Sequence, residues 1–116
     1  MKTLLIAEIV HEANRVLTLA NGSTPQPHWD DAPQRMRDDS LNMVQHTLAY
    51  PEKTAEQDHE NWLAGKRAAG WVWGPDKSEM LKTHPLMIPY SELPAGERLK
   101  NAVLPAIILA CARAAK

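Results

Sequence analysis

Residues 59–94 read HENWLAGKRAAGWVWGPDKSEMLKTHPLMIPYSELP and contain three of the four tryptophans of the chain. Large rings are interleaved there with glycine and proline, most densely in Gly70-Trp71-Val72-Trp73-Gly74-Pro75. Glycine and proline fix unusual backbone geometry rather than extend helices or strands. The stretch therefore predicts an aromatic platform held in a rigid, irregular loop.

On both sides of this stretch, apolar residues recur at helical spacing. The spacing predicts four helices, over residues 3–20, 33–49, 55–68 and 94–114. Thr54 and Gln57 form a capping box at the start of the third helix, and Gly70 ends it. In the fourth helix, Pro105 predicts a kink or a break. The residues expected on the apolar face of that helix are Leu99, Val103, Ile107 and Ala110.

The predicted β structure is small. Trp71–Trp73 is expected to be a short strand, with both tryptophans on one face and Val72 on the other. Residues 78–82 are expected to form a helical turn, and residues 86–88 a second extended piece. The predicted fold is therefore mainly α, with about four helices and a small β element, in a single domain over residues 1–116.

Composition excludes several classes of protein. The net charge is −1, which argues against direct nucleic-acid binding, because that needs a basic surface. The single cysteine, Cys111, excludes an intrachain disulfide and a multi-cysteine metal site. There is no run of roughly 20 apolar residues such as a membrane span needs. These features predict a soluble protein of the cytoplasm.

The ordered landmarks of the chain resemble those of the RyR domain, a repeat first described in ryanodine receptors and also found singly in phage and bacterial proteins. The residues that carry the resemblance are His11-Glu12-Ala13-Asn14-Arg15, Trp29, Ala32-Pro33, Arg37, His59, Trp62, Lys66, Gly70-Trp71-Val72-Trp73-Gly74, Lys77, Lys82, His84-Pro85, Pro89-Tyr90 and Leu93-Pro94. The resemblance covers roughly residues 5–105 and leaves residues 106–116 as an alanine-rich helical tail. Trp73 is a departure, because the family more often has tyrosine there.

The resemblance carries further expectations. It implies a mainly helical fold with short strands and no catalytic activity. Because the receptor repeats occur as pseudo-twofold pairs, it suggests that a lone copy forms a homodimer. A single copy in a short chain looks like the phage or prophage members, which would act in the host cytoplasm. Such members have been suspected of capturing nucleotide-derived signals related to ADP-ribose or cyclic nucleotides.

Two interpretations of the rings remain open. In the first, the aromatic residues form a wall on which a planar base stacks, and nearby basic groups meet its phosphate. The candidate ligand-binding residues are Trp71, Trp73, Lys77, Lys82, His84, Tyr90, Trp29 and Arg15. In the second, the rings are simply core, because a chain without phenylalanine must fill its interior with other large side chains.

No motif in the chain predicts catalysis, a metal or a cofactor. No two histidines lie at the i, i+4 spacing of a helical metal site. His11, His59 and His84 are instead expected to be structural, each bonding a backbone carbonyl or packing against Trp62. Cys111 lies in an apolar helix without a nearby histidine, so we expect it to be inert. We therefore predict a protein that is not an enzyme.

The sequence also suggests a function of a different class, a protein-interaction module that binds a host or viral protein. An exposed apolar surface usually marks an interface. The apolar tail over residues 102–115, or one face of the helix over residues 3–20, would supply that surface.

Overall fold

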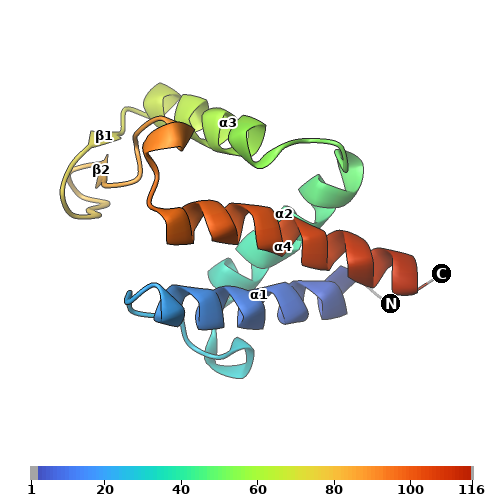
Figure 1. The fold of residues 1–116 in the computed structure, drawn as a ribbon. Coiled ribbons are helices and arrows are strands. Elements are labelled where there is room, and N and C mark those ends of the chain that lie inside the picture. Colours follow the sequence, from blue (N-terminus) through green and yellow to red (C-terminus); the bar gives the residue numbers. More distant parts are fainter. Residues whose placement is uncertain (1–2, 116) are drawn as a thin grey trace. The chain divides into compact units, whose positions relative to one another are not determined.

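A computed structural model describes residues 3–115 and is mainly helical (Figure 1). Within that range it contains four α-helices, two 3₁₀-helices and two short strands: α1 (Thr3–Ala20), η1 (Trp29–Asp31), α2 (Gln34–Ala49), α3 (Ala55–Ala68), β1 (Val72–Trp73), β2 (Thr83–His84), η2 (Tyr90–Glu92) and α4 (Ala95–Ala114). The prediction of four helices with a small β element is confirmed. The chain forms two compact units, one of residues up to Glu52 and from Leu99 onward, the other of Lys53–Arg98.

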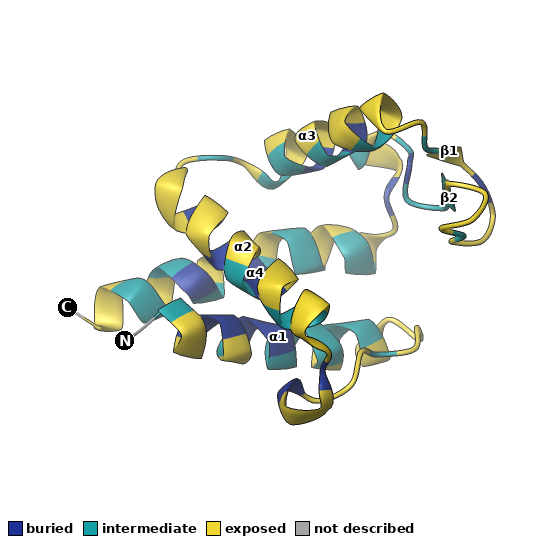
Figure 2. Cartoon of the chain, turned by 180° about the vertical axis from the view of Figure 1, so that it is seen from behind, coloured by how far each residue is buried: buried dark blue, intermediate teal, exposed yellow. Residues whose placement is uncertain are grey.

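The first unit has an aliphatic core. Its α1 residues Ile6, Ala7 and Val10 lie on one face because their spacing is helical. Figure 2 shows that the buried part of α1 lies along one side of the helix. The remaining buried members of the core come from η1, α2 and α4, and they are Trp29, Val44, Leu104 and Ile108. This core holds the two ends of the chain together in one unit.

The buried face of α4 differs from the prediction. Leu99 was expected inside but is 54% exposed, whereas Leu104 is 6% exposed and Ile108 is fully buried. The predicted residues and the residues that are in fact buried both have helical spacing. The buried set is shifted by one residue along the chain, which turns the buried face of the helix by about 100°. Of the predicted kink or break at Pro105, the break is wrong, since α4 continues through this residue, and the kink stays a prediction. Pro105 removes one backbone hydrogen bond, and the buried side chains on either side of it hold the helix in place.

This packing of α4 also bears on the interaction hypothesis. Because Leu104 and Ile108 lie in the core, the tail over residues 102–115 is not an unpartnered apolar segment. On α1, by contrast, Val16 and Leu19 are exposed. A docking role for one face of α1, or for the residues of the tail that lie outside the core, therefore stays a prediction.

The second unit begins at a capping box. The Thr54 hydroxyl accepts a hydrogen bond from the Gln57 amide at 3.1 Å, and the Gln57 side chain accepts one from the Thr54 amide at 2.9 Å. These two bonds satisfy donors that the first turn of a helix leaves free. Gly70 has a φ of +89°, the left-handed conformation typical of a residue that ends a helix. Both predicted ends of α3 are confirmed.

The two strands pair in parallel, with Val72 opposite Thr83 and Trp73 opposite His84. The first strand was predicted, but the second lies at residues 83–84 and not at residues 86–88. Pro85 explains this position, because a proline drives the preceding residue into an extended conformation. Residues 78–82 form a turn rather than a helical turn, closed by paired backbone hydrogen bonds between Ser78 and Thr83, each 3.0 Å long.

Candidate functional site

The second unit contains a group of rings, here called the ring cluster: His59, Trp62, His84 and Tyr90, which are linked by ring contacts, and Trp71, which is linked to Trp62 through Lys66. α3 supplies two of them, because His59 and Trp62 are one helical turn apart. Their rings stack with centroids 5.5 Å apart and planes inclined by 26°. The His59 Nε2–H group donates a hydrogen bond of 2.7 Å to the Ile88 carbonyl. His59 thus ties α3 to the segment after β2, and its predicted structural role is confirmed.

Lys66 lies between two tryptophans of the ring cluster. Its Nζ atom is 4.0 Å from the ring centroid of Trp71 and 6.0 Å from that of Trp62. An ammonium group at this distance is attracted by the negative face of an indole. The contact holds Trp71 half-buried against α3 and keeps a positive charge next to the rings.

His84 is the ionisable ring of the cluster. Its plane meets the Trp62 ring edge-on at a centroid distance of 5.0 Å. The Leu86 backbone N–H donates to its Nδ1 atom at 3.1 Å, so the neutral imidazole carries its proton on Nε2. Burial lowers the pKa of His84, and the positive charges of Lys77 and Lys66 lower it further. The lowered pKa favours the neutral imidazole, which lies near two positive charges.

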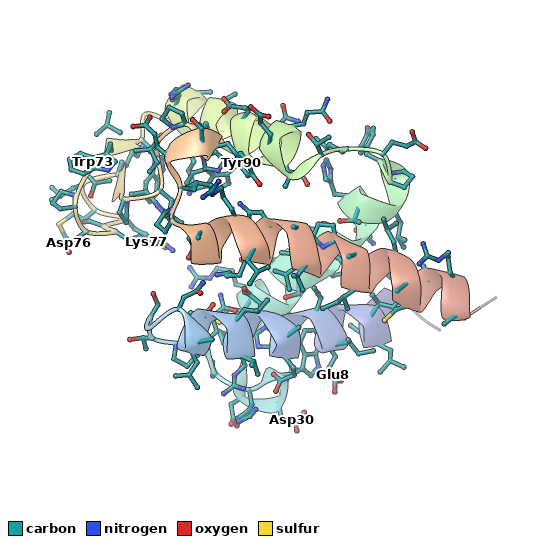
Figure 3. The ribbon with its side chains drawn as sticks, in the orientation of Figure 1. Glu8, Asp30, Trp73, Asp76, Lys77 and Tyr90 are labelled. Carbon is teal, nitrogen blue, oxygen red and sulfur yellow. The ribbon has the colours of Figure 1, made fainter. Side chains whose placement is uncertain are left out.

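Trp73 lies opposite His84 in the strand pair, and paired residues of adjacent strands point to the same face of a sheet. Its indole is 56% exposed. Figure 3 shows Trp73 with Asp76 and Lys77 on the strand and loop that follow α3. Trp73 and His84 thus form one surface, here called the Trp73–His84 face.

The other predicted residues of this unit have structural contacts. Lys82 donates from Nζ to the Ala69 carbonyl at 2.8 Å, where it neutralises the negative end of α3. Tyr90 is half-buried and its ring lies 6.2 Å from that of His59. The core interpretation therefore fits some of these rings in part, and the ligand-wall interpretation stays a prediction for the rest. Tyr90 and Trp71 are partly packed, whereas Trp73 is open to solvent.

Trp29 and Arg15 belong to the first unit, and the prediction that Trp29 lines a ligand wall is wrong. Trp29 is only 7% exposed, since it packs in the core with Arg37 over its ring at 5.2 Å. Arg15 donates from Nε to the Gln26 carbonyl at 2.8 Å and lies 3.5 Å from the Glu12 carboxylate. Because a tryptophan is equally suited to a protein core and to a surface, the residue type alone did not distinguish a buried Trp29 from a ligand-binding one.

Glu12 organises the loop before Trp29. Its carboxylate accepts hydrogen bonds from His28 Nδ1 at 2.9 Å and from the Trp29 backbone N–H at 3.2 Å. The bond from His28 is the largest cause that lowers the pKa of Glu12; the bond from Trp29 and the charges of Arg15 and His28 add to it, and burial partly opposes it. A carboxyl group whose pKa is lower in the folded state stabilises the protein above its unfolded pKa.

Replacing Glu12 by glutamine should therefore reduce the free energy of unfolding at pH 7. This difference should shrink as the pH falls through the folded pKa of Glu12, because the wild-type carboxyl group is then protonated as well. Urea denaturation of both proteins between pH 7 and pH 3 measures it. Glu8→Gln, an exposed position on the same helix, is the control and should give no such convergence. A constant difference between wild type and Glu12→Gln at all pH values would contradict the assignment.

Trp62 and Lys66 were not among the predicted ligand-binding residues. A signal was present, because Trp62 and Lys66 are four residues apart and lie on one face of α3. The direction of that face could not be predicted from this spacing.

Within residues 3–115 the structure brings together no group of three histidine, cysteine or acidic side chains that could hold a metal ion. Over the same range, none of the helices has the length and apolar character that crossing a membrane requires.

Comparison with known families agrees with the resemblance seen in the landmarks. A family model for the RyR domain matches residues 31–109, well over half of the chain. The match begins after α1, so His11–Arg15 lie outside it, and it extends into α4 beyond Pro105. All residues of the ring cluster, together with Trp73 and Lys77, lie inside the matched range. The chain belongs to the RyR domain family.

Proposed function

We propose that this RyR domain is a non-catalytic binding module that captures a small, ring-bearing anion of nucleotide type on the Trp73–His84 face. One observation carries the proposal. Trp73, which is exposed, is the cross-strand neighbour of His84, and the positive charges of two lysines act on the His84 imidazole. An aromatic surface with adjacent positive charge is complementary to a base attached to a phosphate.

The indole of Trp73 would bind the ring of the ligand. More than half of its surface is exposed, so a planar base can cover it without rearrangement of the core. Stacking of one base on an aromatic side chain contributes about 1–3 kcal/mol. The short strand pair limits the motion of the Trp73 backbone, and a ring held in place loses little conformational entropy when it binds.

Lys66 and Lys77 would attract the anionic group. Both act on His84 from different segments, Lys66 from α3 and Lys77 from the loop after β1. Neither ammonium group forms an ion pair with a side chain of residues 3–115; Lys66 instead contacts two tryptophan rings, and Lys77 is exposed. Two ammonium groups without a carboxylate partner favour an anionic ligand.

Trp73→Ala should weaken binding by about 5- to 150-fold, which is the change in affinity that corresponds to the loss of one stacked base. Calorimetric titration with AMP, cyclic AMP, ADP-ribose and adenosine would measure the effect, after a thermal-shift screen of the same compounds. Val72→Ala is the matched control, because Val72 is similarly exposed at 58% but lies on the opposite face of the strand pair. It should leave the affinity unchanged.

Two results would overturn the proposal. The first is the absence of binding heat and of thermal stabilisation with every anionic compound at millimolar concentration. The second is binding that Trp73→Ala and Val72→Ala weaken equally, which would place the ligand elsewhere.

A further inference from the structure

We propose that His84 couples ligand binding to proton uptake, so that the domain binds its anionic ligand more tightly as the pH falls below 7. This inference rests on the proposed function, since it concerns the same Trp73–His84 face. It adds a regulatory property of that face and assigns it to a single atom, Nδ1 of His84.

A hydrogen bond from the backbone fixes which nitrogen of the neutral His84 imidazole carries the proton. Leu86 N–H donates to Nδ1 of His84, so this nitrogen is an acceptor and the ring proton lies on Nε2. Within residues 3–115 no hydrogen bond joins Nε2 to another group, so its N–H is left for a ligand oxygen. A second proton can bind only at Nδ1, where it takes the lone pair that Leu86 uses.

The two charged groups that lower the pKa of His84 are both positive, while the loop that carries one of them also contains Asp76, Glu79 and Lys82. α3 contributes Lys66, and the loop after β1 contributes Lys77. β1 and residues 85–88 contain no ionisable side chain, and His59 lies one ring away beyond Trp62. These positive charges and burial disfavour the imidazolium ion in the free protein. A bound anion would place a negative charge beside these two lysines and the imidazole, and would thereby raise the pKa of His84.

The direction of the pH effect follows from linkage. If the pKa of His84 is higher in the complex than in the free protein, binding takes up a proton at pH values between the two. Affinity then rises as the pH falls through that interval and levels off below the pKa of the free protein. One unit of pKa difference corresponds to at most tenfold in affinity.

Proton uptake also has a structural consequence. Protonated Nδ1 can no longer accept the Leu86 N–H, so the turn that follows β2 loses one hydrogen bond in the complex. The next residues of this turn include Ile88, whose carbonyl holds His59. Hydrogen exchange at the Leu86 amide should therefore be faster in the complex than in the free protein, although ligands usually slow exchange near their site.

Calorimetric titration with ADP-ribose at pH 7.5, 6.5 and 5.5 tests the inference, because the diphosphate of this probe stays fully ionised over that range. We expect affinity to increase about three- to tenfold from pH 7.5 to pH 5.5. Buffers of different ionisation enthalpy should reveal net proton uptake. The ring resonances of His84, followed by NMR, should give a higher pKa in the complex than in the free protein.

His84→Asn is the informative variant, because its side-chain oxygen keeps an acceptor for Leu86 N–H but does not titrate. It should bind ADP-ribose with one affinity at all three pH values. Wild-type binding that does not change with pH, or a pH dependence that persists in His84→Asn, would overturn the inference and leave the proposed function intact. Absence of ADP-ribose binding at every pH, with no binding of the other nucleotides, would overturn both.

Discussion

Leu104→Ala is expected to lower the free energy of unfolding by about 2–5 kcal/mol, the usual cost of removing a buried leucine side chain. Leu104 is 6% exposed and packs with Ile108 against α1 residues in the core of the first unit. The truncation leaves a cavity between helices from the two ends of the chain. Urea denaturation followed by circular dichroism would measure the loss.

Leu99→Ala provides the matched control for this substitution. It makes the same chemical change in the same helix, at a residue that is 54% exposed. We expect it to change the free energy of unfolding by no more than about 0.5 kcal/mol. Equal losses for the two variants, or a larger loss for Leu99→Ala, would mean that the face of α4 predicted from its sequence is the buried one after all.

Gly74→Ala is expected to destabilise the second unit by about 1–3 kcal/mol, the range found for overpacking at a close contact. A Cβ atom at Gly74 would lie 2.6 Å from Cβ and 2.9 Å from Cγ2 of Thr83. Both atoms of Thr83 belong to the paired strand, so the methyl group can be accommodated only if β1 and β2 separate. Hydrogen exchange of the strand amides, together with thermal denaturation, would measure the effect.

Gly65→Ala should instead increase the stability of the protein. Gly65 lies inside α3, and a Cβ atom there would meet nothing within 4 Å. Alanine is preferred over glycine in a helix by about 0.5–1 kcal/mol, so this variant should be more stable than the wild type. Stabilisation by both glycine substitutions would contradict the close approach of Gly74 to Thr83.

The bounds of α3 illustrate what can be predicted locally. Thr54 and Gln57 bond each other's backbone across one turn, and Gly70 reaches a conformation that few other residues adopt. Both signals act between residues close in sequence, so neither requires a partner from elsewhere in the chain. The second strand was misplaced for the complementary reason. Its position depends on pairing with β1, and only the extended conformation before Pro85 is a local property.

The residues of the candidate site were likewise predicted from the sequence only in part. The landmarks of the family and the concentration of rings in residues 59–94 were visible from the printed sequence, and they led to Trp71, Trp73, Lys77 and His84. Trp29 was included wrongly, because its ring carries the same chemistry whether it is buried or exposed. Lys82 was expected to meet a ligand, yet its ammonium group is bonded to the end of α3.

Residue types and their spacing were thus sufficient for the four helices, the family and the ring-rich segment, because propensities, caps and turns act over a few residues. Packing selected the buried face of α4, the exposed indole of Trp73 and the neutral imidazole of His84. Each of these depends on which atoms of distant segments lie against a side chain. Burial, contact and charge environment are properties of that arrangement and do not belong to any residue alone.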